Sequence, residues 1–265
     1  MKPPTQKEVS TLKSQCADSW FRDWFQEDYL ILYQHRDTKE AGDFLDRILP
    51  QLSPRPKGWM LDLACGAGRH VHYLASLGLP VVGLDLSKSL LKNAIHSSPI
   101  SDLLWIQADM RAVPFGKNSF SVVMNLFTSF GYFGDDWDNV MVIQEVSRIL
   151  KPNGWLVLDT LNPSEVIANL VPKSQRQEGN ISITEERSID PKQHRVNKII
   201  GIKRGKQRKT FRESVRMYEV DELHSMMQSA HLIPKILWGD YQGSEYQSQS
   251  PRIIIAAQAH AADTV

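Results

Sequence analysis

The segment that most constrains the fold spans residues 59–85 and reads WMLDLACGAGRHVHYLASLGLPVVGLD. It opens with an apolar run of the length typical of a buried strand and continues into a Gly-Ala-Gly turn at residues 66–68. An amphipathic segment with helical spacing follows, and a second apolar run ends on Asp85. This succession of strand, glycine turn, helix, strand and acid predicts a βαβ unit of the nucleotide-binding type.

The residue types in this unit suit a ligand that contains a ribose. Glycines lack a Cβ and let the backbone approach a ligand, and the helix that follows offers unpaired N–H donors. A carboxylate at Asp85 can accept hydrogen bonds from both ribose hydroxyls. The dinucleotide fingerprint requires a third glycine where this chain has Val71, and it usually lacks an acid such as Asp62 before the loop. A strand-turn-helix unit that holds no ligand is the alternative.

Two motifs carry a resemblance to a known family. The first, Asp62-Leu-Ala-Cys-Gly-Ala-Gly68, resembles the first motif of the class I S-adenosylmethionine-dependent methyltransferases. The second, Leu150-Lys-Pro-Asn-Gly154 followed by an apolar run to Asp159, is also similar to that family. The resemblance covers residues 59–159 and implies S-adenosyl-L-methionine as the cofactor. It also implies a Rossmann-like α/β fold, in which a seven-stranded mixed sheet has helices on both faces and its last strand runs antiparallel between the fifth and the sixth.

Apolar runs and capping residues place the remaining elements. Ser87 and Asp135 are good N-caps for helices that extend to Ile95 and Leu150, and a further helix is predicted over residues 218–230. Residues 58–265 are therefore interpreted as the core, with a small antiparallel β insertion at 161–217. In sugar N-methyltransferases and related enzymes of this family, comparable additions shape the acceptor pocket. Core strands are predicted at 59–64, 80–85, 103–108, 120–127, 155–159, 232–237 and 252–259, and insertion strands at 181–186, 195–203 and 209–217.

Residues 1–57 are predicted to form an N-terminal helical cap and a linker. Aromatic residues recur at helical spacing within residues 8–49, and residues 50–57 are rich in proline. One interpretation is a helix that covers the sheet. Another is a lid over the cofactor, with Tyr29, Tyr33, His35 and Arg36 facing the site, and both can hold at once. The resemblance implies that a tyrosine or arginine of this segment meets the cofactor carboxylate.

The resemblance also assigns roles to residues of the glycine loop and its flanking strands. Asp62 is expected near the cofactor ammonium or its binding loop. Gly66 and Gly68 are expected to admit the backbone to the cofactor, and Asp85 to hold the ribose.

Further candidates follow the third and fourth strands. Asp109 is implied to accept the adenine amine, which only donates, with the backbone of Met110 beside the ring; a cap of the next turn is the alternative for Asp109. The carboxyl end of the fourth strand places five residues beside the transferable methyl group, where aromatic faces stabilise a sulfonium: Asn125, Phe127, Thr128, Tyr132 and Phe133. The predicted cofactor-binding set is Asp62, Ala64, Gly66, Gly68, Asp85, Leu86, Asp109, Met110, Asn125, Phe127, Tyr29, Tyr33 and Arg36.

No catalytic base is assigned from the sequence. His35, Tyr132 and Asp159 are candidates by position only, and an acceptor that is already nucleophilic needs no base. No metal site is expected, because His70 and His72 are two residues apart on a helix and neither HExxH nor paired CxxC occurs.

Composition limits the partners and the compartment. The net charge of +1 argues against a globally basic nucleic-acid binder. No apolar run approaches the ~20 residues that a membrane span requires. Cys16 and Cys65 are the only cysteines, so a disulfide framework is not expected and a cytoplasmic location is predicted.

The sequence therefore predicts an enzyme that moves a methyl group in line from S-adenosylmethionine to an O, N or C nucleophile of a small molecule. No membrane partner is expected, nucleic acid is disfavoured, and the oligomeric state is left open. The alternatives are a catalytically silent protein that binds S-adenosylmethionine and an NAD(P)-dependent oxidoreductase. An RNA methyltransferase, with a basic hairpin tip at residues 203–209, is a further variant.

Overall fold

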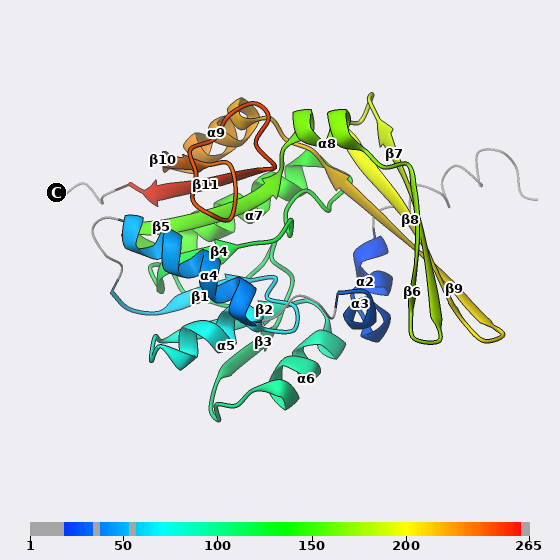
Figure 1. Cartoon of the computed structure of the whole chain (residues 1–265). Coiled ribbons are helices and arrows are strands. Elements are labelled where there is room, and N and C mark those ends of the chain that lie inside the picture. Colours follow the sequence, from blue (N-terminus) through cyan, green and yellow to red (C-terminus); the bar gives the residue numbers. More distant parts are fainter. Residues whose placement is uncertain (1–18, 34–37, 53–56, 261–265) are drawn as a thin grey trace, which may run out of the picture.

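The chain is organised around one mixed sheet (Figure 1). The computed structural model describes residues 19–33, 38–52 and 57–260. Strands β1 to β5 pair in parallel, whereas β11 is antiparallel to both β5 and β10. The predicted seven-stranded sheet is confirmed, and so is the position of its last strand. The strands, in the order β10-β11-β5-β4-β1-β2-β3, are β1 (Met60–Leu63), β2 (Val81–Asp85), β3 (Leu104–Gln107), β4 (Phe120–Asn125), β5 (Leu150–Leu161), β10 (Leu232–Trp238) and β11 (Arg252–Ala259).

Helices cover both faces of this sheet because its central strands are apolar on both sides. Every residue of β1, β2 and β4 is buried. One face packs against α4 (Thr38–Ile48), α5 (Arg69–Ser76) and α6 (Lys88–Ser97). The other face packs against α7 (Asp136–Ile149) and α9 (Val220–Ser229). Strands buried on both faces need near-continuous apolar sequence, which is why the runs could be recognised.

The N-caps expected from the sequence are present. The Ser87 hydroxyl accepts a hydrogen bond from the N–H of Leu90 at 3.1 Å. The Asp135 carboxylate accepts one from the N–H of Trp137 at 2.8 Å. Each bond satisfies a donor that the first turn of a helix leaves without a partner, so α6 and α7 begin where the sequence placed them.

The N-terminal region differs from the helical interpretation of residues 8–49. Its described part forms separate helices, α2 (Trp20–Trp24), α3 (Glu27–Leu32) and α4, with a short 3-10 turn η1 (Leu49–Gln51) after α4. The first break has a packing reason. The ring of Trp24 lies 4.8 Å from that of Phe211, whereas the ring of the adjacent Phe25 stacks on Tyr132 at 5.4 Å. These contacts accompany the end of α2 at Phe25, where ψ is 64° and leaves the helical region. Residues 8–18 lie outside the described residues.

A second, smaller sheet follows β5 and the short helix α8 (Pro163–Asn169). Its strands β6 (Lys173–Glu178), β7 (Ile181–Asp190), β8 (Arg195–Arg204) and β9 (Gln207–Arg216) are antiparallel in that order. The sequence predicted the last three but not β6, whose residues KSQRQE are all polar and offer no apolar alternation. Figure 1 shows α2 and α3 between this sheet and the central one. No helix in the described part of the chain combines the length and the apolar character needed to cross a membrane.

Candidate functional site

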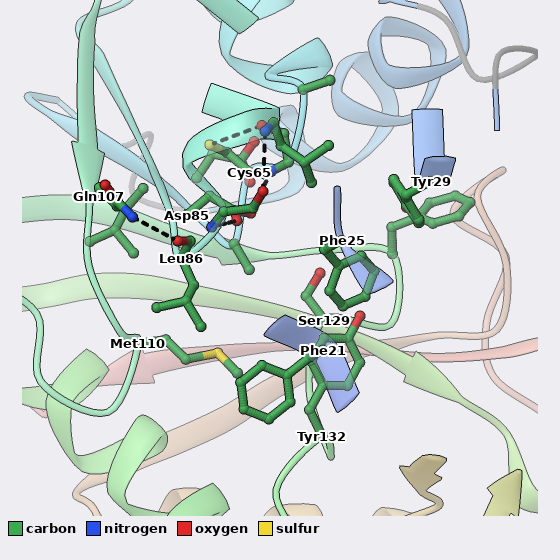
Figure 2. A pocket seen from close by; sticks show the side chains of 18 of the residues that line it. Phe21, Phe25, Tyr29, Cys65, Asp85, Leu86, Gln107, Met110, Ser129 and Tyr132 are labelled. Atoms are coloured by element: carbon green, nitrogen blue, oxygen red, sulfur yellow. Dashed lines mark hydrogen bonds between the residues drawn. The ribbon is translucent and has the colours of Figure 1, made fainter. Parts of the chain in front are cut away.

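A cavity of about 460 Å³ opens at the carboxyl ends of the parallel strands. The segments that follow β1, β2, β3 and β4 line one side of it, and residues of α2 and α3 line the other. Figure 2 shows Asp85 and Leu86 from the sheet, and Phe21, Phe25 and Tyr29 from the two helices. This edge of an open parallel sheet is where ligands bind.

The turn after β1 brings backbone to the cavity. Ala64 and Gly66 adopt left-handed backbone conformations, with φ of 63° and 56°. A Cβ built on Gly66 would meet only the Leu90 side chain, at 3.9 Å, so the space in front of this glycine is open. Gly66 also lines the cavity, so its missing side chain leaves room for a ligand against the backbone.

Asp85 ends β2 at the floor of the cavity. Its carboxylate accepts hydrogen bonds from the N–H of Gly66 at 2.8 Å and from the N–H of Ser87 at 2.7 Å, one on each oxygen. Burial raises the pKa of Asp85 to about 6, although these backbone hydrogen bonds lower it. Each oxygen keeps lone-pair capacity beyond its backbone bond, so the group can accept two further hydrogen bonds from a ligand.

Asp62 is the most unusual polar group of the cavity. The residue is 1% exposed, and its Oδ2 atom has no hydrogen-bond partner. The closest basic atom is Nδ1 of His70, 3.6 Å away, which is beyond a normal hydrogen bond. Buried polar atoms are nearly always hydrogen-bonded, so an unpartnered carboxylate oxygen at the wall of a cavity indicates a place for a donor from a ligand.

Asp109 follows β3 and is partly engaged within the protein. Its oxygens accept hydrogen bonds from the backbone and the guanidinium of Arg111 at 2.8–3.1 Å. Burial raises the pKa of Asp109, but the bonds from Arg111 outweigh burial, and the pKa lies below its usual value. The bond from the backbone of Arg111 is the turn cap expected as the alternative function of Asp109. The same side chain lines the cavity, so capping and ligand binding are compatible.

An aromatic wall faces these carboxylates. It consists of Phe21, Phe25, Tyr29, Tyr132 and Phe133, which all line the cavity. The ring of Tyr132 is stacked with both Phe21 and Phe25, at 6.4 Å and 5.4 Å between centroids. Burial raises the pKa of Tyr132 well above its ordinary value, so its hydroxyl stays protonated at neutral pH. The wall is therefore apolar and cation-tolerant, and the Tyr132 hydroxyl keeps its proton.

The second sheet supports this wall from behind and does not itself line the cavity in the described residues. The Trp24 indole donates to the Glu213 carboxylate at 2.6 Å, and the Lys198 ammonium donates to the Tyr33 hydroxyl at 2.9 Å. Lys198 also pairs with Glu213 at 2.7 Å. The expectation that the insertion shapes the pocket directly is therefore changed. Its contacts with the cavity run through α2 and α3, and through the backbone carbonyls of residues 131–133, which accept hydrogen bonds from Arg195.

Comparison with known proteins agrees with this geometry. Residues 61–158 match a family model described as "Methyltransferase domain". Residues 61–158 are a methyltransferase domain. Together with the fold and the similar proteins below, this match agrees with the class I S-adenosylmethionine-dependent methyltransferase family expected from the sequence. The family, the enzyme class and the cofactor expected from the sequence are thereby confirmed.

Similar proteins extend the match beyond this domain. YqeM of Bacillus subtilis (strain 168), whose name assigns it to the methyltransferases, is 28% identical over 244 residues, which cover 88% of this chain and 95% of YqeM. The dTDP-3-amino-3,4,6-trideoxy-alpha-D-glucopyranose N,N-dimethyltransferase of Streptomyces venezuelae is 28% identical over 149 residues, 54% of this chain and 61% of that protein. An S-adenosylmethionine-dependent methyltransferase from Clostridium acetobutylicum ATCC 824 has a similar fold, with a TM-score of 0.75 and 17% identity over 88% of this chain and 96% of its own.

Most residues predicted from the methyltransferase motifs meet in the cavity. Tyr132, a candidate base, lies there as well. Sequence reasoning missed Phe21, Phe25 and Ser129 as lining residues, although the first two belong to the aromatic pattern that suggested a lid. The predicted cofactor-binding residues that line the cavity are Tyr29, Tyr33, Asp62, Ala64, Gly66, Asp85, Leu86, Asp109, Met110 and Phe127.

Other predicted residues lie elsewhere. Gly68 does not line the cavity, and its missing side chain has a packing reason: a Cβ there would lie 2.3 Å from the ring of Trp105. Asn125 is buried behind the cavity and donates to the carbonyl of Leu63 at 2.9 Å. Asp159 also lies outside the cavity. His35 and Arg36 fall outside the described residues.

Metal ligation has no candidate within residues 19–33, 38–52 and 57–260. No group of three or more His, Cys, Asp or Glu side chains there is placed to hold an ion. His72 instead approaches the carbonyl of Ala94 at 3.0 Å, and burial lowers its pKa. Cys65 is a buried free thiol at the cavity, and burial, followed by the neighbouring carboxylates Asp85 and Asp62, raises its pKa well above the usual value.

Proposed function

We propose that the cavity holds S-adenosylmethionine and that the chain transfers its methyl group to a small-molecule acceptor. The observation that carries the proposal is the unpartnered, buried Oδ2 of Asp62 in a cavity that also contains Asp85. An ammonium group has three donors and no acceptor, and a ribose offers two hydroxyl donors. The two carboxylates therefore match the two ends of one nucleoside that carries an amino acid.

In this arrangement Asp62 would pair with the ammonium, Asp85 would accept from the ribose hydroxyls, and the backbone at Gly66 would lie against the ligand. Asp109 would accept from the adenine amine, with Met110 beside the ring. When bound, S-adenosylmethionine supplies a methyl group activated by a sulfonium. The protein then contributes position and a dry pocket, since in-line methyl transfer requires no covalent intermediate with the chain.

The aromatic wall is the proposed place of the acceptor. Its rings exclude water from the reacting atoms and stabilise cationic character through their faces. Tyr132 keeps its proton, so it would donate a hydrogen bond there rather than act as a base. This favours an acceptor that is nucleophilic without deprotonation by the protein, such as a neutral amine. The amino-sugar N,N-dimethyltransferase among the similar proteins supports the same acceptor class.

The first experiment is calorimetric titration of the purified chain with S-adenosylmethionine, S-adenosylhomocysteine and NADH. We expect micromolar binding of the first two and none of NADH. Asp62→Asn should weaken both by roughly 10- to 100-fold, because it removes the charge that faces the ammonium. Asp43→Asn, on the exposed side of α4, is the control. Binding of NADH alone would favour the oxidoreductase alternative. Equal affinities of wild type and Asp62→Asn for S-adenosylmethionine would refute the role of Asp62.

A second experiment separates an enzyme from a silent binding protein. The chain is incubated with S-adenosylmethionine and a panel of small amines, including amino sugars, and methylated product is sought by mass spectrometry. Product formation supports the proposal, and binding without product from any member of a broad acceptor panel would favour the silent protein. The cytoplasmic location and the absence of nucleic-acid partners stay predictions from composition.

A further inference from the structure

The turn that follows β4 contains two consecutive non-glycine residues in the left-handed region. Phe127 has φ of 64° and Thr128 has φ of 62°. A β-branched residue in this region is an outlier, and the neighbouring Phe127 is bulky. Such a conformation persists only where surrounding contacts enforce it, and it concentrates at functional sites.

Asp159 of β5 supplies those contacts. One oxygen of its carboxylate accepts the N–H of Phe127 at 2.7 Å, and its backbone carbonyl accepts the N–H of Thr128 at 3.2 Å. Arg252 of β11 donates to the hydroxyl of Thr128 at 2.7 Å. Both residues of the strained turn are thus held by a strand pair that lies beside them in the sheet.

The Asp159 carboxylate cannot act as a base, because its lone pairs are already used by hydrogen bonds within the protein. The residue is 0% exposed. Its Oδ1 pairs with the Arg252 guanidinium at 2.7 Å and 2.8 Å, and its Oδ2 accepts from the Tyr241 hydroxyl at 2.9 Å as well as from Phe127. It lies outside the cavity and borders a void of about 10 Å³, room for about one water molecule. Asp159, near the end of β5, therefore has a structural role that requires no chemical step.

The strained turn has a consequence inside the cavity. Phe127 lines the cavity, its ring is parallel to that of Tyr241 at 5.8 Å and 9°, and the Arg69 guanidinium lies 4.4 Å from its centroid. Arg69 lines the cavity too. Relaxation of the turn would therefore move the ring and remove the surface on which the guanidinium rests.

We propose that Asp159 and Arg252 are positioning residues: they hold the 127–128 turn in its left-handed conformation and thereby set the affinity of the cavity for its cofactor without touching it. The proposal rests on the proposed function, since the cofactor is taken to be S-adenosylmethionine. Thr128 offers the clearest test, because its side chain does not line the cavity. A change there can alter affinity only through the turn.

The experiment measures the dissociation constant of S-adenosylhomocysteine by calorimetry, with melting temperatures as a check on folding. Thr128→Val removes the hydroxyl that Arg252 holds, and we expect binding about 5- to 10-fold weaker. Thr210→Val, on exposed β9, should leave the constant unchanged. Asp159→Asn should weaken binding by about 10- to 100-fold.

A rescue distinguishes positioning from direct contact. Thr128→Gly lowers the cost of the left-handed conformation, so the double variant Asp159→Asn/Thr128→Gly should recover part of the lost affinity. Loss without recovery, at an unchanged melting temperature, would overturn the proposal, as would an unchanged constant in Thr128→Val. If the wild type bound neither S-adenosylmethionine nor S-adenosylhomocysteine, the proposed function itself would fall. The two failures are therefore distinguishable.

Discussion

Replacement of Asp85 by asparagine tests both the fold and the site. Burial raises the pKa of Asp85 from 3.8 to about 6 in the folded chain. A difference of about 2 pH units corresponds to ~3 kcal/mol between the two protonation states. Because the folded-state pKa is raised, the protonated carboxyl of Asp85 favours the folded chain. This contribution to stability is fully present below about pH 4 and is lost as the pH rises through about 6. The carboxylate is thus held at a cost at neutral pH.

Urea denaturation of wild type and Asp85→Asn between pH 4.5 and 7.5 measures that cost. About 2 kcal/mol of the ~3 kcal/mol falls inside this window, so the free energy of unfolding of wild type relative to the variant should decrease by about 2 kcal/mol as the pH rises. Ser101→Ala, at an exposed position without a titratable group, should show a flat difference. A flat difference for Asp85→Asn as well would refute the burial argument.

Cofactor binding should show the opposite preference. If the ribose binds the ionised Asp85 carboxylate, protonation of Asp85 competes with binding. With a pKa of about 6, the wild-type affinity for S-adenosylhomocysteine should therefore fall by about tenfold from pH 8 to pH 5. Asp85→Ala should lose roughly 1.5–3 kcal/mol of binding at pH 8. An unchanged dissociation constant in that variant would remove Asp85 from the ribose site, whatever its effect on stability.

Three further outcomes follow from the same contacts. Gly68→Ala should destabilise the fold by about 2–4 kcal/mol in urea denaturation, because the backbone is left-handed there and the new Cβ would clash with Trp105. Gly66→Ala should lose only about 1–2 kcal/mol of stability and mainly weaken the binding of S-adenosylhomocysteine. Equal stability losses would contradict the assignment of Gly68 to packing and Gly66 to the cavity. Lys198→Met should cost about 3–5 kcal/mol and speed hydrogen exchange in residues 20–33, because it removes the cation that pairs with the Glu213 carboxylate. Unchanged exchange would show that this ion pair does not support α2 and α3. Neutralising Lys206 and Arg208 at the exposed hairpin tip should leave S-adenosylhomocysteine binding unchanged, and salt-sensitive RNA binding lost in that variant would favour the RNA methyltransferase alternative.

The predictable parts of the fold are those whose signals lie within the local sequence. The strands of the central sheet are apolar on both faces, and the caps Ser87 and Asp135 stand directly before their helices. β6 has neither signal, since its polar residues pair with β7 through the backbone and through polar side chains such as Lys173 and Ser174, without an apolar face. The break after α2 depends on where Trp24 and Phe25 find partners, and those partners come from β9 and from the segment before α7.

The site shows the same division between local and distant information. Asp62 and Asp85 were predictable because motif spacing places them at strand ends that meet at one edge. Gly68 has the same motif signal, yet the Trp105 ring of the adjacent β3 explains its missing side chain.

Asp159 marks where motif reasoning stops. A carboxylate near the end of a core strand is a candidate base by position, because the local sequence does not show which residues will bind it in the fold. Its partners Arg252 and Tyr241 are more than 80 positions away along the chain and reach it because β11 enters the sheet antiparallel beside β5. The same insertion that closes the sheet therefore supplies the cation that neutralises Asp159. Asp159, which by position is a candidate for proton transfer, therefore has a structural role, and the aromatic wall stays the proposed place of the acceptor.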